Sequence, residues 1–268
     1  GYFFENMPVS FSVRGQQKSM VSTTFELQGN VIGFQFPEGY DRKRQLTIDP
    51  ELIFSTFSGS TADNWGFTAT YSYDGSLYSG GIVLDIGFPT TTGVFEPDYI
   101  GEWDVGILKY DSTGTNLLWA TYLGGSFSET PQSIIENSQG QLVIYGTTSS
   151  PDFPMTDHGF QRHFLGGDPI YDTTVYRRLV GGLPFKNGSD IFLAVLGEDG
   201  QTLDGATFIG GTENDGLLEK YQPLTKNYGD QFRGEVILDD QDNIYVASNT
   251  SSPDFTLKNA FQSMYGGG

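Results

Sequence analysis

Apolar and polar residues alternate with a period of two along most of the chain, in short runs that end at glycine-rich or polar turns. Near the start, "VSFSV" places Val9, Phe11 and Val13 on one face of an extended strand, and the run at 30–36 repeats the pattern. Long runs of Ala, Leu, Glu and Lys, typical of helices, are absent. The pattern predicts an all-β protein in which residues 1–50 form the end of an upstream β-rich, sandwich-like domain.

Residues 51–268 contain a repeated unit. An apolar opening run that ends in Gly-Ser, Gly-Gly-Ser or Gly-Gly-Thr occurs three times, at 52–60, 117–126 and 203–212. A pair of runs around a polar turn follows each, at 68–81, 133–146 and 235–248. Two copies close with a further run, at 104–114 and 190–200. Four short strands per copy predict β-propeller blades, about two full and a partial third, with insertions at 167–189 and 213–234.

The hexapeptide TSSPDF occurs at 148–153 and again at 250–255, at the same place in two copies. We interpret it as a structural turn, in which hydroxyl and carboxylate groups bond to nearby backbone, proline rigidifies the bend and phenylalanine enters the core. The residues concerned are Ser149, Ser150, Pro151, Asp152 and Phe153, and Ser251, Ser252, Pro253, Asp254 and Phe255. No histidine or lysine stands beside these serines in sequence, which disfavours a catalytic role. The first copy has "GGIVLDIGFP" at 80–89 instead, so the motif is not required in every blade.

These repeats resemble the SBBP family, the seven-bladed β-propeller repeats of bacterial surface proteins. The resemblance rests on "STFSGS", "ATYLGGS" and "ATFIGGT" in the opening runs, on "QGQLVIYGTTSSPDFP" and "DNIYVASNTSSPDF", and on the tails "GFQ" and "AFQ". It covers roughly residues 46–268. The stretch "QLTIDPELIFSTFSGS" is similar to the junction between an upstream β-rich domain and a first blade, and "NYGDQFRGEVILD" to a variant found in large exported proteins of gliding Bacteroidota.

The resemblance implies an extracellular or outer-surface location and export by type IX secretion, with the secretion machinery and cell-surface components as partners. Proteins of this kind usually carry a C-terminal sorting domain, which is not within this sequence. The chain begins without an initiator methionine, and a propeller closes with about four to eight blades. We therefore expect a piece of a longer precursor.

The charge balance narrows the range of partners. The chain has 14 basic and 33 acidic residues, for a formal net charge of −19, and a field of this sign repels nucleic-acid phosphates and anionic membranes. No stretch reaches the roughly 18 apolar residues of a membrane span. The absence of cysteine excludes disulfides, zinc-thiolate sites and cysteine nucleophiles. We expect no nucleic-acid partner and no membrane span in this segment.

One insertion concentrates charged residues. Glu213, Asp215, Asp230 and Glu235 lie in or beside it, together with Arg233. Carboxylates at the right separation hydrolyse glycosides, and hard oxygen ligands bind Ca²⁺. The structural alternative, which we favour, is an Arg233 ion pair that pins the loop onto its blade.

Other motifs point to no cofactor and no metal. The acidic run at 239–243 starts like a calcium loop, but Ile244 and Thr250 stand where such a loop needs Gly and Glu, so we interpret it as a hairpin turn. His158 and His163 are five residues apart, which would place them on opposite faces of a strand.

Two tryptophans are candidates for ligand contact. Trp65 and Trp103 lie in predicted loops and could stack on sugars if exposed, whereas Trp119 lies in an opening run and is expected in the core.

We expect a non-enzymatic, adhesin-like protein for binding or display, with a glycan or protein ligand, as part of a large gliding-associated protein. One alternative is a propeller carbohydrate hydrolase or lyase that uses the acidic residues of 213–235, and another is a passive structural spacer. Carboxylates that converge in an open cleft would favour the enzyme. Trp65 and Trp103 exposed on one rim would argue against the spacer.

Overall fold

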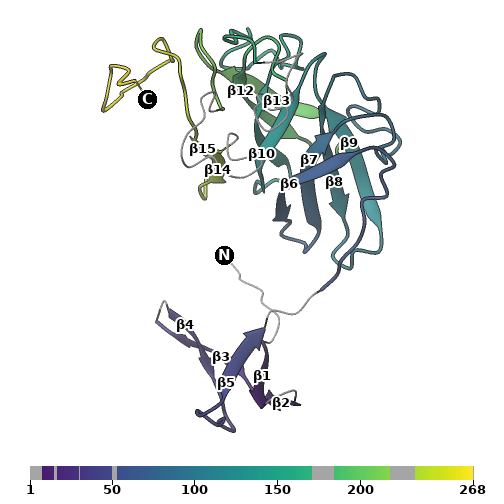
Figure 1. The fold of residues 1–268 in the computed structure, drawn as a ribbon, viewed down its shortest axis with the longest axis vertical. Coiled ribbons are helices and arrows are strands. Elements are labelled where there is room, and N and C mark those ends of the chain that lie inside the picture. The colour runs from purple at the N-terminus through teal and green to yellow at the C-terminus, as the bar shows by residue number, and fades with distance from the viewer. Residues whose placement is uncertain are drawn as a thin grey trace. The chain divides into compact units, whose positions relative to one another are not determined.

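The computed structural model describes residues 8–14, 17–29, 31–49, 53–170, 184–217 and 233–267. Every regular element in these residues is a β-strand, which confirms the predicted all-β class (Figure 1). The chain divides into two compact units, Gly1–Ser55 and Thr56–Gly268. The sequence had predicted a division after residue 50.

The first unit contains two small antiparallel sheets. Its strands are β1 (Val9–Arg14), which lies between β2 (Gln17–Val21) and β5 (Gln45–Asp49), and the paired β3 (Thr24–Gln28) and β4 (Val31–Gln35). Phe11 is buried on the central strand, whereas Val9, on the same face, is 37% exposed at the strand end. Phe25 and Phe34 are directly opposite each other on β3 and β4, with ring centroids 5.5 Å apart. Such cross-strand aromatic pairs stabilise a two-stranded sheet.

The described residues of the second unit form three antiparallel sheets. The first sheet comprises β6 (Asn64–Tyr71), β7 (Leu77–Val83), β8 (Asp104–Tyr110) and β9 (Leu117–Leu123), in that order. The second sheet comprises β10 (Glu129–Glu136), β11 (Leu142–Thr148), β12 (Asp190–Leu196) and β13 (Leu203–Ile209), again in chain order. The third sheet is the hairpin β14 (Glu235–Leu238) and β15 (Ile244–Ala247). Four-stranded meanders that repeat along the chain are blade-like units.

The strands group differently from the predicted repeat. The opening runs at 117–126 and 203–212 are the outermost strands of their sheets, β9 and β13. The equivalent run at 52–60 forms no strand over its described part, 53–60, and Phe57 within it is 95% exposed. A strand had been predicted there. The physical reason is that β9 and β13 each pair with the third strand of their own sheet, and among the described residues no such strand precedes 53–60.

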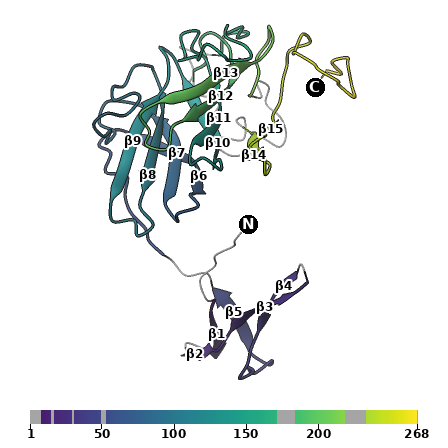
Figure 2. The ribbon, with the colours of Figure 1, turned by 180° about the vertical axis from the view of Figure 1, so that it is seen from behind.

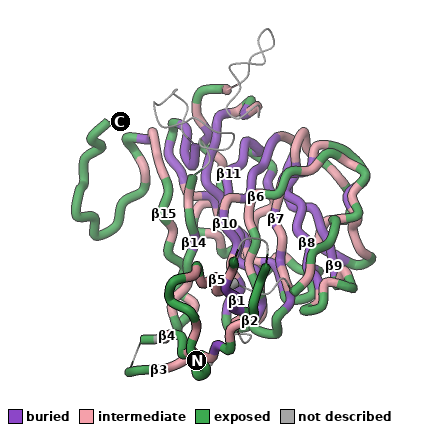
Figure 3. Tube along the Cα trace, turned by 60° about the horizontal axis from the view of Figure 1, so that its bottom comes forward, coloured by how far each residue is buried: buried purple, intermediate pink, exposed green. Residues whose placement is uncertain are grey.

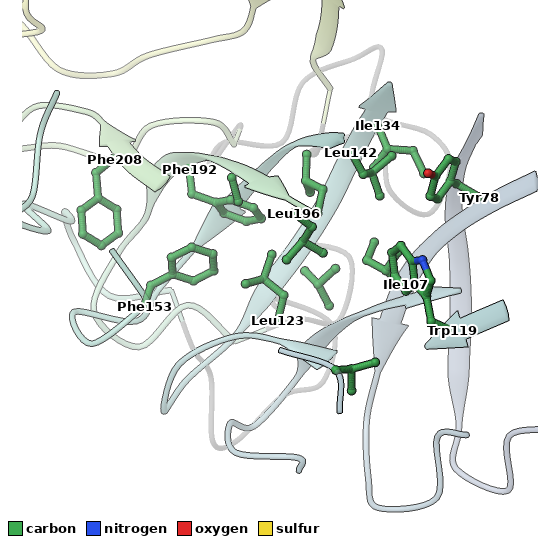
Figure 4. Close-up of a cluster of buried hydrophobic side chains, with 14 residues drawn as sticks. Tyr78, Ile107, Trp119, Leu123, Ile134, Leu142, Phe153, Phe192, Leu196 and Phe208 are labelled. Carbon is green, nitrogen blue, oxygen red and sulfur yellow. The ribbon is translucent and has the colours of Figure 1, made fainter. Parts of the chain in front are cut away.

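The sheets stack face to face in chain order, with β10 against β6 and β7, and β14 against β10 and β11 (Figures 1 and 2). Because side chains alternate along a strand, one set of each sheet faces the preceding sheet and the other set faces the next. The contact between the first and second sheets, here the first seam, holds the main core (Figure 4). Its buried residues include Tyr78, Ile107 and Leu123 of the first sheet and Ile134, Leu142, Phe192 and Phe208 of the second.

Burial follows this stacking, and β10 and β11 of the second sheet are buried along almost their whole length (Figure 3). Val143, Tyr145 and Ile191 on its far face pack against Val236 of the third sheet. Each large apolar side chain buried in this way contributes roughly 1.5–3 kcal/mol of transfer free energy.

Candidate functional site

The first hexapeptide fastens the loop at 124–128, which joins the first sheet to the second. Asp152 Oδ1 accepts a hydrogen bond from the Ser126 backbone N–H at 2.9 Å, and Oδ2 accepts one from the Ser126 hydroxyl. Ser150 Oγ accepts from the Phe127 N–H at 2.8 Å. The Thr148 hydroxyl donates to Glu129 Oε1 at 2.6 Å. The polar groups of the motif therefore bind the protein's own loop.

The second hexapeptide makes the same contacts one sheet further on. Asp254 Oδ1 accepts from the Thr212 N–H at 3.0 Å, and Ser252 Oγ accepts from the Glu213 N–H at 3.0 Å. The Ser252 hydroxyl lies 2.9 Å from Asp215 Oδ2. Two identical sequences thus hold two equivalent loops.

The phenylalanine of the motif is an anchor in the core. Phe153 is buried, with its ring centroid 4.5 Å from that of Phe192 and 6.3 Å from that of Phe208. In the first sheet, Phe88 takes the corresponding place against Tyr122, at 5.4 Å.

In the first sheet a backbone group replaces the aspartate of the motif. The Gly87 carbonyl accepts a hydrogen bond from the Thr61 N–H at 3.0 Å, and Gly87 has a φ of 129°, in a region that favours glycine. "GGIVLDIGFP" therefore keeps the loop contact and the aromatic anchor without Thr-Ser-Ser-Pro-Asp.

The described acidic residues in and beside the second insertion do not converge in an open cleft. Asp215 is fully buried, Oδ2 accepts from the Gly211 N–H at 2.7 Å, and burial raises the pKa of its carboxyl. Glu235, the first residue of β14, accepts a hydrogen bond from the Ser133 hydroxyl of β10 at 2.6 Å. Glu213 and Arg233 are exposed. Asp230 lies outside the described residues.

The two candidate tryptophans contact each other. Trp65 is the second residue of β6 and pairs with Ile82 of β7, so it lies on a strand and the predicted loop position was wrong. Trp103 immediately precedes β8. The two rings meet edge to face, with centroids 5.9 Å apart and planes at 80°, and Trp65 remains 39% exposed. Trp119 is buried in the first seam, as predicted.

The described end of the first insertion reaches back to this tryptophan pair. Phe185 is fully buried in a cluster with Ile82 and Leu217, against which Trp103 packs. Lys186 forms an ion pair with Glu102. The insertion of the second sheet therefore covers part of the first sheet.

A cavity of about 150 Å³ lies beside Trp65, on the face of the first sheet that is turned away from the second. Ser58, Asn64 and Ser79 supply polar groups to its wall, and the remainder is glycine and apolar side chains. Ligand pockets for drug-sized molecules are usually about 300–1,000 Å³. This cavity has room for one small group of a larger ligand.

Three buried carboxyls, Asp104, Glu129 and Asp190, and the half-buried Glu96 were missed from the sequence. Burial raises the pKa of Glu96 to about 7, of Asp104 to about 6, of Glu129 to about 8 and of Asp190 to about 7. The signal that could have found two of them is their place in the repeat, since Asp104 and Asp190 begin the equivalent runs "DVGIL" and "DIFLA".

Among the described residues, no group of three or more His, Asp or Glu side chains is arranged to hold a metal ion. In the acidic run at 239–243, Asp239 Oδ1 accepts from the backbone N–H groups of Gln241 and Asn243, both at 2.9 Å. Hydrogen bonds within the turn, chiefly from the Asn243 side chain, lower the pKa of Asp239 to about 2. This carboxylate stabilises a hairpin turn. His158 and His163 are exposed in loops and do not lie on a strand.

Comparison with known proteins finds a match at the start of the chain. A family model described as a domain of unknown function, DUF7948, matches residues 1–51. No curated protein matches the chain. Within the described ranges, no helix is long and apolar enough to cross a membrane. The first unit is therefore similar to a domain whose function is itself unassigned.

Proposed function

We propose that residues 56–268 are consecutive blades of an SBBP-like β-propeller, and that the chain is a non-enzymatic module for binding or display. Support comes from two sheets with the same strand order and from loops held by the same hexapeptide. The observation that carries the non-enzymatic role is the state of Asp215. It is fully buried and bound by Gly211 and Ser252, so this carboxylate of the acidic insertion is engaged in holding the loop.

Trp65 supports a binding role over a passive spacer. Its ring contacts that of Trp103 edge to face, the residue is 39% exposed, and it is among the residues that line a small cavity with polar groups. A rigid aromatic surface beside hydrogen-bonding groups suits a sugar ring or an apolar side chain of a protein ligand. We place the contact with a glycan or protein ligand there.

We further propose an extracellular or outer-surface location, export by type IX secretion and a part in gliding-associated adhesion in a member of the Bacteroidota. These proposals rest on the resemblance of the repeats. An acidic surface is compatible with them, because it keeps the protein soluble without attracting nucleic acid.

The binding proposal is tested on arrays of bacterial and host glycans and on extracted surface polysaccharides and proteins. Trp65→Ala should abolish binding, while Tyr71→Ala, which removes an aromatic ring 72% exposed on the same strand, should leave it unchanged. No binding by the unsubstituted chain would favour the spacer. Release of reducing sugar that Asp215→Asn abolishes would favour the enzyme.

A further inference from the structure

Three carboxyl groups meet at one point of the first seam. Glu96 comes from the connection between β7 and β8, Asp104 begins β8, and Glu129 begins β10. A Cβ added to Gly124 would lie 2.5 Å from Asp104 Oδ1 and 2.7 Å from Glu129 Oε2. Glu96 Oε2 accepts a hydrogen bond from the Gly124 N–H at 3.1 Å. Acidic groups of both sheets therefore surround the loop that joins them.

All hydrogen bonds to these carboxyls come from neutral donors. Asp104 accepts from the N–H groups of Ile100 and Gly101 at 2.8 and 3.0 Å. Glu129 accepts from the Gly125 N–H at 3.0 Å and from the Thr148 hydroxyl at 2.6 Å. In the part of the chain that the structure describes, no lysine, arginine or histidine forms an ion pair with any of the three.

The elements packed around the three carboxyls add further acidic groups and one cation. Around the three carboxyls lie further groups that carry negative charge when ionised. They are Asp98, Tyr99 and Glu102 from the connection that carries Glu96, Asp85 from the segment after β7, Tyr122 from β9 and Asp152 from the hexapeptide. Lys186, from the first insertion, is paired with Glu102. Ionisation of Glu96, Asp104 and Glu129 would therefore add negative charge to surroundings that are already negative.

The second copy of the repeat serves as an internal control, because it has Gln161 at the position where the first copy has Glu96. Gln161 Oε1 accepts from the Gly210 N–H at 3.2 Å, the counterpart of the bond from Gly124. The backbone N–H groups of Glu96 and Gln161 donate to the hydroxyls of Thr121 and Thr207, at 3.0 and 2.8 Å. An uncharged amide thus makes the same contact, so the fold requires an acceptor at this position and not a negative charge.

We propose that protonation controls how firmly the loop at 124–128 is held at the first seam. When Glu96, Asp104 and Glu129 lose their protons, their mutual repulsion loosens this loop from the hexapeptide. The loop is held firmly to the hexapeptide at mildly acidic pH and less firmly at alkaline pH. The raised pKa values of the three groups, about 7, 6 and 8, place the change between about pH 6 and pH 8. The inference is independent of the proposed ligand.

Amide hydrogen exchange of the whole chain, measured at about pH 5.5, 7 and 8.5 and corrected for the intrinsic rate, tests the proposal. We expect protection in residues 124–128 to fall at least about tenfold over this range, because one pKa unit of differential interaction corresponds to a factor of ten. Glu96→Gln should reduce that fall, and its structural tolerance is indicated by Gln161. Gln161→Glu should increase the pH dependence of protection in residues 210–215, where the pKa of Asp190 is already raised.

Protection in 124–128 that does not change with pH would overturn the proposal. So would a Glu96→Gln protein with the full pH dependence of the unsubstituted chain, since the charge at position 96 would then have no part in it. A Gln161→Glu protein whose protection in 210–215 depends on pH no more strongly than in the unsubstituted chain would also contradict it.

Discussion

The carboxylate of Asp152 accepts a hydrogen bond from the backbone N–H of Ser126 at 2.9 Å, across 26 residues of sequence. Asp254 and Thr212 make the same bond at 3.0 Å. A hexapeptide occurs twice in this chain because the same loop must be fastened twice, once after β9 and once after β13. The bond reaches a different loop, whereas a local turn would satisfy its own backbone.

Asp152→Ala should destabilise the chain by about 1 kcal/mol, because two hydrogen bonds to a partly exposed carboxylate are lost. The midpoint of urea unfolding measures this. Asp157→Ala is the matched control, since Asp157 forms only an exposed ion pair with Arg162 and such pairs contribute little. If the two substitutions lower the urea midpoint equally, the hydrogen bonds from Asp152 to the loop contribute no more to stability than an exposed ion pair.

Gly106→Ala should be destabilising by roughly 1–3 kcal/mol, the usual range for overpacking. An added Cβ would lie 2.6 Å from Val83 Cγ2 and 2.7 Å from the Phe88 ring. Gly106 occupies the place of Phe192 in the second sheet, so glycine here makes room for Phe88.

Gly205→Ala is the control for Gly106→Ala. Its added Cβ would meet Val195 at 3.6 Å, an ordinary contact. The thermal unfolding midpoints of the two variants test whether the added methyl group is overpacked. A Gly106→Ala protein as stable as Gly205→Ala would contradict the packing argument.

The chain should be most stable in mildly acidic solution. Burial raises the folded-state pKa of Glu96, Glu129 and Asp190 to about 7, 8 and 7, whereas unfolded carboxyls titrate near about pH 4. The folded state therefore binds more protons than the unfolded state between these values, and stability falls as the pH rises from about 5 to 8. Urea midpoints at constant ionic strength measure the slope. A urea midpoint that rises as the pH increases from about 5 to 8 would show that these carboxyls do not have raised pKa values in the folded state.

The alternation of apolar residues predicted most of the strands but not their grouping into sheets. The runs containing Trp119 and Phe208 have strand periodicity, and both are strands. Which sheet they complete depends on hydrogen bonds to β8 and β12, and periodicity carries no information on strand partners. The run containing Phe57 has the same pattern and forms no strand over its described part.

The candidate site could be predicted only in part for a related reason. Asp215 and Glu235 were grouped because they are near each other in sequence, but Asp215 binds Ser252 and Glu235 binds Ser133. The acidic groups that do converge, Glu96, Asp104 and Glu129, are separated along the chain and brought together only by sheet stacking. No spacing rule finds such a group, although comparison of equivalent positions in the repeats would have marked Asp104, the counterpart of Asp190.

Phe185→Ala should destabilise the chain by about 3–5 kcal/mol, because it leaves a cavity in a closed cluster. Phe185 is fully buried between Ile82 of the first sheet and Leu217, and it belongs to the insertion of the second sheet. The substitution should also raise hydrogen exchange near Trp103, since the insertion would lose its apolar anchor on the first sheet. Phe160→Ala removes a ring that is 70% exposed and should change stability by less than about 0.5 kcal/mol. If both variants unfold at the same urea concentration, the insertion is an independent appendage and does not brace the two sheets.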